Sequence, residues 1–249
     1  MNTYFAEALA FPKVAALAKS GAVALLPVGS TEAHGPHLPL SVDVVIAEAV
    51  CTRVGQKLNQ AQREVVVFPA LAYALTEFAK PFAGTVSLSR TTALAMTTEV
   101  LAGIAAHGFS RIGVINHHLE PEHFRVVKEA GRTASTPTCR IIVVDHRKAP
   151  TGPSLGHEFM HGGSHAGTYE TALMLAVAPT LVDERERAKL APNPVDLPAR
   201  IKAGATNFNE CGGPEAYFGA PASATVAEGA RLLALLVDQA FSEISIPEV

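Results

Sequence analysis

The first concentration of chemically active side chains lies in a loop near the start of the sequence. Within a dozen residues it holds the two carboxylates and two imidazoles of Glu32, His34, His37 and Asp43, among glycines and prolines. Carboxylate oxygens and imidazole nitrogens bind divalent metals, and glycine lets the backbone bend tightly around an ion. The loop therefore favours a metal site. In the structural alternative, Asp43 caps the helix predicted to follow it, and the histidines are ordinary loop residues.

A second group of candidate ligands follows another apolar segment. Residues 111–115 predict a buried strand, and the chain continues with Asn-His-His-Leu-Glu-Pro, which puts His118 and Glu120 just beyond it. The loop that carries Glu32 and His34 follows the apolar segment 22–28 in the same way. In parallel α/β sheets, ligands gather at the carboxyl ends of the strands. We therefore expect both loops at one edge of one sheet, which the structural alternative does not predict.

A third group lies in the glycine-rich stretch 162–171, Gly-Gly-Ser-His-Ala-Gly-Thr-Tyr-Glu-Thr. The glycines around His165 allow another group to approach the backbone closely. Glu170 lies near the start of a predicted helix, where its charge also suits the positive end of the helix dipole. With the two other loops nearby, these side chains become candidates for acid or base chemistry.

Strands and helices alternate along the chain. The predicted strands are 22–28, 64–69, 111–115 and 140–144, and the predicted helices are 44–58, 89–107, 121–134, 172–178 and 225–244, with an amphipathic segment at 5–19. Such alternation predicts a mostly parallel sheet with helices on both faces, joined by right-handed crossovers. No linker or internal repeat divides residues 1–249, so we expect a single α/β domain.

The composition of the 249 residues limits the function classes. The net charge of −3 and the lack of a Lys/Arg cluster argue against nucleic-acid binding. No apolar run reaches the roughly 18 residues of a membrane span, and the first residues do not resemble a signal peptide. Three dispersed cysteines fit free buried thiols in a reducing cytoplasm. Hydrophobic residues make up 48%, which suits helices that bury surface against each other or against other subunits.

Two long segments are irregular. The first, 70–88, contains Tyr73, Glu77 and Phe78, which we expect to line a pocket because long loops in compact domains are often functional. The second, 181–219, is polar and rich in proline, and its part 207–219 is either a lid or an inter-subunit arm. We expect the remaining loop histidines mostly outside the site or behind its ligands: these are His37, His117, His123, His146, His157 and His161.

The first loop, Gly-Ser-Thr-Glu-Ala-His-Gly-Pro-His-Leu-Pro-Leu-Ser-Val-Asp, resembles the signature of the creatininase (creatinine amidohydrolase) family. Three further stretches match in the family's order: Gly-Thr-Val-Ser-Leu at 84–88, Ile-Asn-His-His at 115–118 and His-Ala-Gly-Thr-Tyr-Glu-Thr at 165–171. The resemblance covers nearly the whole chain. It implies a three-layer α/β/α sandwich with a mostly parallel central sheet, usually assembled as a hexamer.

The resemblance also implies two divalent metal ions per chain, commonly Zn²⁺ or Mn²⁺, with Fe²⁺ as a further candidate. By position, Glu32, Asp43 and His118 would bind one metal. His34 would bind the other, with Asp43 bridging the two. The remaining carboxylate would be Glu120, because His-Leu-Glu at 118–120 resembles the His-x-Glu of creatininase itself, where many members have His-Gly-Gly-Asn.

Two further residues match family positions. Glu170 would support the metal site or compete with Glu120 as a ligand. His165 matches the histidine proposed to pass a proton to the leaving nitrogen. Creatininase also frames its substrate with tryptophans, and this sequence contains none. Creatinine itself is therefore not the expected substrate.

The expected activity is metal-dependent hydrolysis of a small cyclic amide, or of a related non-peptide C–N bond, by metal-activated water. Opening a cyclic amide also requires a proton for the departing nitrogen, which the imidazole of His165 can supply. Two alternatives stay open. One is ring opening of a cyclic ketone or lactone with the same metals, and the other is a non-catalytic family member that binds a small ligand.

Overall fold

The computed structural model describes residues 2–162 and 164–246. At the centre of this part of the chain is a five-stranded sheet with the order β1-β3-β2-β4-β5, and every neighbouring pair is parallel. The strands are β1 (Thr3–Phe5), β2 (Val23–Val28), β3 (Val65–Val67), β4 (Arg111–Asn116) and β5 (Arg140–Val143). This sheet confirms the predicted parallel α/β architecture.

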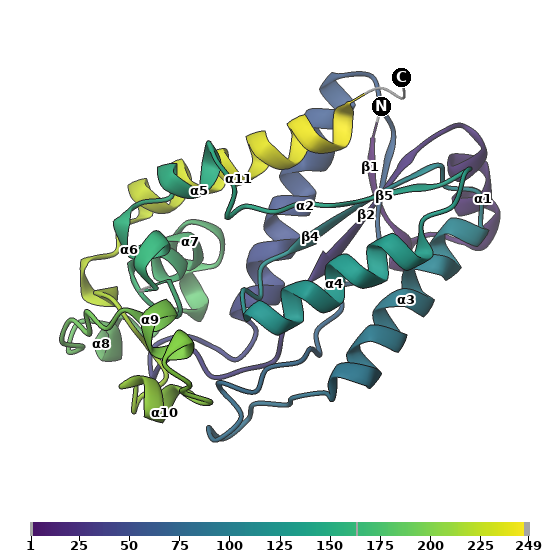
Figure 1. Ribbon diagram of the computed structural model, residues 1–249. Coiled ribbons are helices and arrows are strands. Elements are labelled where there is room, and N and C mark those ends of the chain that lie inside the picture. Colours follow the sequence, from purple (N-terminus) through teal and green to yellow (C-terminus); the bar gives the residue numbers. More distant parts are fainter. Residues whose placement is uncertain (1, 163, 247–249) are drawn as a thin grey trace.

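Helices cover both faces of the sheet, which gives the predicted three-layer sandwich (Figure 1). The helices on one face are α2 (Val42–Gln60), α7 (Thr168–Val177) and α11 (Val226–Ser245). Those on the other are α1 (Phe11–Lys19), α3 (Arg90–Ala106) and α4 (Pro121–Ala134).

The strand β2 explains why two separate cores form. All its residues are buried, as expected for a strand covered on both faces. Side chains alternate across a strand, so Val23 and Leu25 pack into the core beneath α2 and α11. Ala24, Leu26 and Val28 pack into the core beneath α3 and α4. The apolar run at 22–28 therefore supplies both layers at once.

The chain before β2 differs from the expectation of one amphipathic segment at 5–19. It begins with the edge strand β1, passes through a 3-10 turn at Ala6–Ala8 and then forms α1. A strand of three residues is too short to show an alternating pattern in the sequence. Its position follows from pairing with β3, a partner about sixty residues away along the chain.

The first turns of α3 and α2 show which of the predicted polar residues cap a helix. Ser89 caps α3 as predicted, since its hydroxyl accepts a hydrogen bond from the Thr92 amide at 3.2 Å. At the start of α2 the N-cap position is Ser41, and Asp43 lies inside the first turn. The Asp43 carboxylate instead accepts a hydrogen bond from the Ser30 hydroxyl at 2.7 Å. Asp43 is therefore not the N-cap of this helix, and the structural alternative for it is wrong.

Short elements gather at one end of the molecule, where Figure 1 shows α6, α8, α9 and α10 close together. They are α5 (Thr151–Ser154), α6 (His157–His161), α8 (Glu184–Arg187), α9 (Leu197–Lys202) and α10 (Phe208–Cys211), with 3-10 turns at Pro179–Leu181 and Pro221–Ser223. The three cysteines are free and buried, as expected. Among the helices that the structure describes, none has the length and apolar character needed to cross a membrane.

The contact between α7 and α11 depends on a glycine. A Cβ atom on Gly229 would lie 1.8 Å from the carbonyl oxygen of Ala172. We predict that Gly229→Ala forces these helices apart and lowers the free energy of unfolding by about 1–3 kcal/mol. The matched control is Gly103→Ala in α3, where an added Cβ meets nothing within 4 Å. That variant should gain up to about 1 kcal/mol. Urea denaturation followed by circular dichroism measures both, and equal effects would contradict the predicted close contact.

Candidate metal centre

The candidate ligands converge because β2 and β4 are neighbours. Val28 and Asn116, the last residues of these strands, pair directly in the sheet. One residue further on, the His117 amide donates to the Val28 carbonyl at 3.0 Å. The loop of Glu32 and the loop of His118 therefore leave the sheet side by side, at the edge where the sequence pattern predicts a site.

One group of donor atoms comprises Glu32, Asp43 and His118. The Nδ1 atom of His118 lies 3.2 Å from Glu32 Oε1 and 3.2 Å from Asp43 Oδ2. All three side chains are buried, and they offer ligand atoms within 4.8 Å of one another. This is the set expected from the sequence for one metal ion.

A second group comprises His34, Asp43 and Glu170. The Nε2 atom of His34 lies 3.4 Å from Asp43 Oδ1 and 3.5 Å from Glu170 Oε2, and it has no hydrogen-bond partner. These ligand atoms also lie within 4.8 Å of one another. Asp43 thus faces both groups, with Oδ2 towards His118 and Oδ1 towards His34. A carboxylate in this position can bridge two metal ions.

Backbone carbonyls determine which ring nitrogen of each histidine faces the carboxylates. The Nε2 atom of His118 lies 3.0 Å from the Leu75 carbonyl oxygen, and Nδ1 of His34 lies 3.1 Å from the Glu32 carbonyl oxygen. A carbonyl only accepts, so these nitrogens carry the hydrogen and donate it. The opposite nitrogens face the carboxylates, and a divalent cation bound there would take the place of the second proton on each ring. This is the usual way in which an outer partner orients a ligating histidine.

Each carboxylate is also held by a donor. The Ser30 hydroxyl donates to Asp43 Oδ2 at 2.7 Å, and the Thr76 hydroxyl donates to Glu32 Oε2. The Ala166 amide donates to Glu170 Oε2 at 2.7 Å. In Glu32 the bond leaves Oε1 to face His118, whereas in Asp43 and Glu170 the oxygen that accepts the bond also faces a histidine, His118 and His34 respectively. Sequence reasoning missed Ser30 and Thr76, because an isolated hydroxyl residue in a loop gives no signal of its partner.

The electrostatics show how much charge is buried here without a cation. Burial would lower the pKa of His34, but the carboxylates of Asp43 and Glu170 outweigh it and raise that pKa to about 10. Burial raises the pKa of Glu170 to about 8, with support from the charge of Asp43 and against the effect of His34. Burial would also raise the pKa of the Glu32 carboxyl, yet His118 outweighs this effect and lowers that pKa to about 2. Such a set of oxygen and nitrogen donors fits divalent cations, which would neutralise the carboxylates.

His165 belongs to a third group of ligand atoms, with Glu32 and His34, whereas Glu120 lies beside the groups. The Glu120 carboxylate accepts a hydrogen bond from the Phe78 amide at 3.3 Å and lines the pocket, but among the described residues it joins none of the groups of potential ligands. His165 donates from Nε2 to the Ala33 carbonyl at 3.0 Å, and its Nδ1 lies 3.7 Å from Glu32 Oε1. Burial, reinforced by His34, lowers the pKa of His165 to about 4.

A cavity of about 80 Å³ opens onto both groups. Its floor contains Glu32, Asp43, His118 and Glu170, and its apolar side includes Phe208, whose ring centroid lies 4.3 Å from that of His165. Phe208 belongs to the part 207–219 that was expected to be a lid or an arm, and together with Leu197 and Ile201 of the irregular segment 181–219 it lines the pocket of its own chain. Sequence reasoning did not single out Phe208, because its contact with His165 spans about forty residues.

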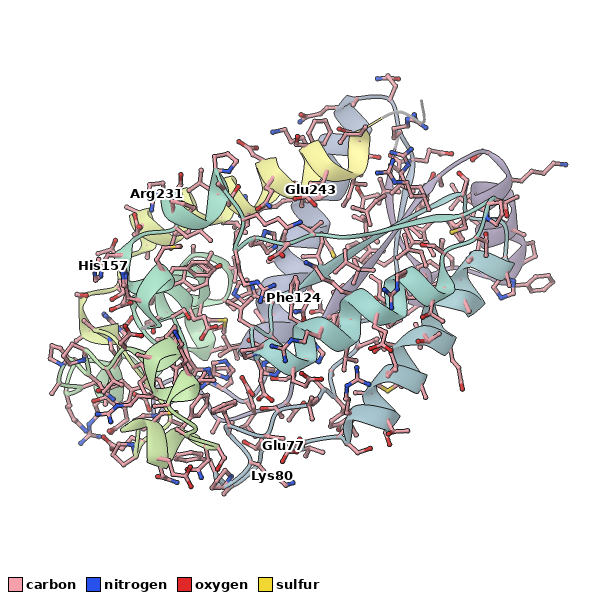
Figure 2. All side chains as sticks on the ribbon, in the orientation of Figure 1. Glu77, Lys80, Phe124, His157, Arg231 and Glu243 are labelled. Carbon is pink, nitrogen blue, oxygen red and sulfur yellow. The ribbon has the colours of Figure 1, made fainter. Side chains whose placement is uncertain are left out.

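Of the residues of segment 70–88 that were expected to line a pocket, only one does so. Phe78 lines the pocket, whereas Tyr73 is exposed. Glu77 does not line it: its carboxylate accepts from Ser87 at 2.7 Å and pairs with Lys80 at 3.0 Å. Figure 2 shows Glu77 and Lys80 together at the outer side of this loop. The expectation for Glu77 is wrong because it has these local partners.

The other histidines divide into buried and exposed ones. Three of them form side-chain hydrogen bonds inside the protein, namely His37 with Thr171 at 2.9 Å, His123 with Asn116 at 3.1 Å and His146 with Gln239 at 3.2 Å. His117 stacks on Tyr169, with 5.6 Å between ring centroids. His157 and His161 stack on one another at the surface, in the short helix α6. Of these, His123 holds Asn116, which directly precedes the loop of His118, whereas His146 is bonded to α11.

Comparison with known proteins shows the family to which the chain belongs. Residues 7–244 match the family described as "Creatininase: Creatinine amidohydrolase". The chain is 34% identical over 233 residues to the "Mycofactocin precursor peptide peptidase" of Mycobacterium tuberculosis (strain CDC 1551 / Oshkosh), a match that covers 89% of this chain and 84% of the relative. It is 31% identical over 186 residues to the "Creatinine amidohydrolase" of Pseudomonas putida, which covers 68% and 69%.

Solved structures agree as well. The structure named "Creatininase Mn" superimposes with a TM-score of 0.74 at 26% identity, over 97% of both chains. The structure named "Crystal structure of creatinine amidohydrolase (creatininase)" superimposes with a TM-score of 0.77 at 25% identity, over 100% of both chains. These matches show that the chain belongs to the creatininase family of hydrolases.

Proposed function

We propose that this protein hydrolyses an amide C–N bond with the help of two divalent metal ions. The single observation that carries the proposal is the position of Asp43, whose two oxygens face different histidines, His118 and His34, and which belongs to two overlapping groups of ligand atoms. One ion would be held by Glu32, Asp43 and His118. The other would be held by His34, Asp43 and Glu170. The solved relative named "Creatininase Mn" makes Mn²⁺ a natural first choice for reconstitution.

This assignment uses Glu170 in place of Glu120 as the last ligand. Glu170 Oε2 lies 3.5 Å from His34 Nε2, whereas the Glu120 carboxylate bonds to the Phe78 amide and faces the pocket from the side. Two ions sharing Asp43 would act as Lewis acids that lower the pKa of water and polarise a carbonyl.

The remaining polar groups are suited to moving protons. The neutral imidazole of His165 lies in the pocket wall beside Glu32, where it can accept the proton that water loses and pass it to the departing nitrogen. Glu120 lines the same cavity, and burial raises the pKa of its carboxyl. It is the second proton carrier within reach of a substrate in that cavity.

Two amide classes fit this chemistry. The first is the small cyclic amide expected from the motifs. The second is a peptide bond, and the specific observation that favours it is the 34% identity, over 89% of this chain, with a protein named "Mycofactocin precursor peptide peptidase". Creatinine itself is the weaker choice, because the chain has no tryptophan to frame it.

Metal content tests the ligand assignment. Protein purified without chelator and equilibrated with Mn²⁺ or Zn²⁺ should contain about two ions per chain by elemental analysis. Glu170→Gln should retain about one, and His118→Ala should lose at least one of the two. Glu120→Gln is the matched control, since it removes a partly buried carboxylate that lines the same pocket, and it should retain about two. Loss of an ion from the Glu120 variant but not from the Glu170 variant would reverse the assignment.

Turnover tests the reaction. The metal-loaded protein should hydrolyse at least one member of a panel of lactams, formamides and short capped peptides, and a chelator should abolish the activity. We predict that His165→Ala keeps its metals but lowers kcat by about 100-fold or more, because the proton relay is lost. The panel also contains cyclic ketones and lactones. Turnover of these alone would replace the amide reaction with ring opening, and binding without turnover would favour a non-catalytic protein.

A further inference from the structure

The cavity above the ligand groups has two unlike halves. Its floor is formed by carboxylates and imidazoles. Its side is apolar, and we call this side the apolar wall: Phe78, Leu119, Pro121, Leu197, Ile201 and Phe208. Covering such a surface with an apolar group is favourable, because both apolar surfaces are then removed from water. The metal chemistry on the floor does not require such a wall, so the wall must serve another purpose.

The apolar wall is a built structure and not an accidental surface. It joins the loop 70–88 to the segment 197–211, since the Phe208 amide donates to the Phe78 carbonyl at 2.9 Å and their rings lie 6.0 Å apart. Behind the wall, Phe208 packs on Phe218, with 5.4 Å between ring centroids. These contacts belong to a separate hydrophobic cluster that also includes Leu197 and Ile201.

Side-chain caps hold the two short helices that carry the wall. At the start of α9, Asp196 accepts from the Ala199 amide at 2.9 Å, and at the start of α10, Asn207 accepts from the Glu210 amide at 3.0 Å. Such caps satisfy amides that a short helix otherwise leaves to water. Ile201 is therefore presented from a capped element, where it remains partly exposed towards the cavity.

The charges that line the cavity also limit which substrates it can bind. Among the described residues that line it, no lysine or arginine occurs, and its ionisable groups are carboxylates and imidazoles. A substrate carboxylate lying against the wall would have no cation to neutralise it, and desolvating an unpaired charge costs several kcal/mol. An uncharged alkyl or aromatic group would gain free energy from the same contact.

We infer that Phe78, Ile201 and Phe208 select substrates carrying an uncharged apolar group beside the scissile amide. They exclude substrates with a carboxylate at that position. This inference rests on the proposed function, because it assumes that the reacting carbonyl lies over the ligand groups on the floor. For a peptide substrate, it predicts an apolar residue next to the cleaved bond.

Hydroxamates test this selection without knowledge of the substrate, since the hydroxamate group binds divalent metals and its tail can be varied. The probes are acetohydroxamate, hexanohydroxamate and the monohydroxamate of adipic acid, which has a similar chain ending in a carboxylate. Affinities for the Zn²⁺- or Mn²⁺-loaded protein are measured by calorimetry. Hexanohydroxamate should bind at least about tenfold more tightly than acetohydroxamate, because its tail would bury roughly two methylene groups against the wall. The carboxylate-tailed probe should gain nothing over acetohydroxamate.

Substitutions of Ile201 test whether the apolar wall causes these differences in affinity. Ile201→Arg should weaken hexanohydroxamate about tenfold and strengthen the carboxylate-tailed probe by a similar factor, which reverses the order of the two. Ile201→Ala should weaken hexanohydroxamate alone. The matched control is Leu181→Arg, which adds the same charge to an exposed position of the same irregular segment outside the cavity. It should leave all three affinities unchanged, and circular dichroism establishes that each variant is folded.

The outcomes separate this inference from the function beneath it. Failure of all three hydroxamates to bind the metal-loaded wild type would overturn the metal centre itself. Binding of all three with equal affinity would leave the metal centre standing and overturn the role of the wall. An unaltered order of affinities in folded Ile201→Arg would do the same, because Ile201 would then not contact the tail.

Discussion

The structure depends on the burial of acidic side chains at one edge of the sheet. Glu32, Asp43 and Glu170 are each almost inaccessible to water, and they meet two buried histidines, His34 and His118. Like charges this close repel one another in a medium that screens them poorly, and removing them from water costs several kcal/mol per group. Such a cluster persists in a stable fold when cations compensate it. The chemistry of the protein follows from that electrostatic requirement.

The fold meets this requirement through the pairing of β2 with β4. Because the two strands are parallel and adjacent, the loops that follow them must leave the sheet together. Their apolar residues are shared between two cores, which makes this edge rigid enough to hold polar groups in place. Ser30 and Thr76 then orient the carboxylates, and backbone carbonyls orient the histidines. The polar ligand loops thus follow two fully buried strands.

Local patterns in the sequence predict the parts of the structure that local physics decides. The run at 22–28 predicts β2, Ser89 predicts the start of α3, and alternation of the elements predicts the sheet and the shared edge. Pairing over long distances lies outside such patterns. The edge strand β1 is too short to show a period, and the contact of Phe208 with His165 leaves no trace in the spacing of residues.

The choice between Glu120 and Glu170 has the same origin. Both are glutamates close to a ligand loop, so their spacing does not distinguish them. Only the packing of α7 against α2 and α11 brings Glu170 Oε2 within 3.5 Å of His34 Nε2, while the Glu120 carboxylate accepts from the Phe78 amide. The hydroxyls of Ser30 and Thr76 escaped sequence reasoning for the same reason, since their partners are distant or unmarked along the chain.

The central claim is that one carboxylate, that of Asp43, joins two metal ions. Electron paramagnetic resonance of the protein loaded with about two equivalents of Mn²⁺ tests it most directly, because two ions bridged by a carboxylate lie roughly 3.5–4 Å apart and their electron spins couple. The account predicts the spectrum of a spin-coupled manganese pair in the wild type, and its loss in Asp43→Asn. A spectrum of isolated Mn²⁺ ions in the fully loaded wild type would contradict it.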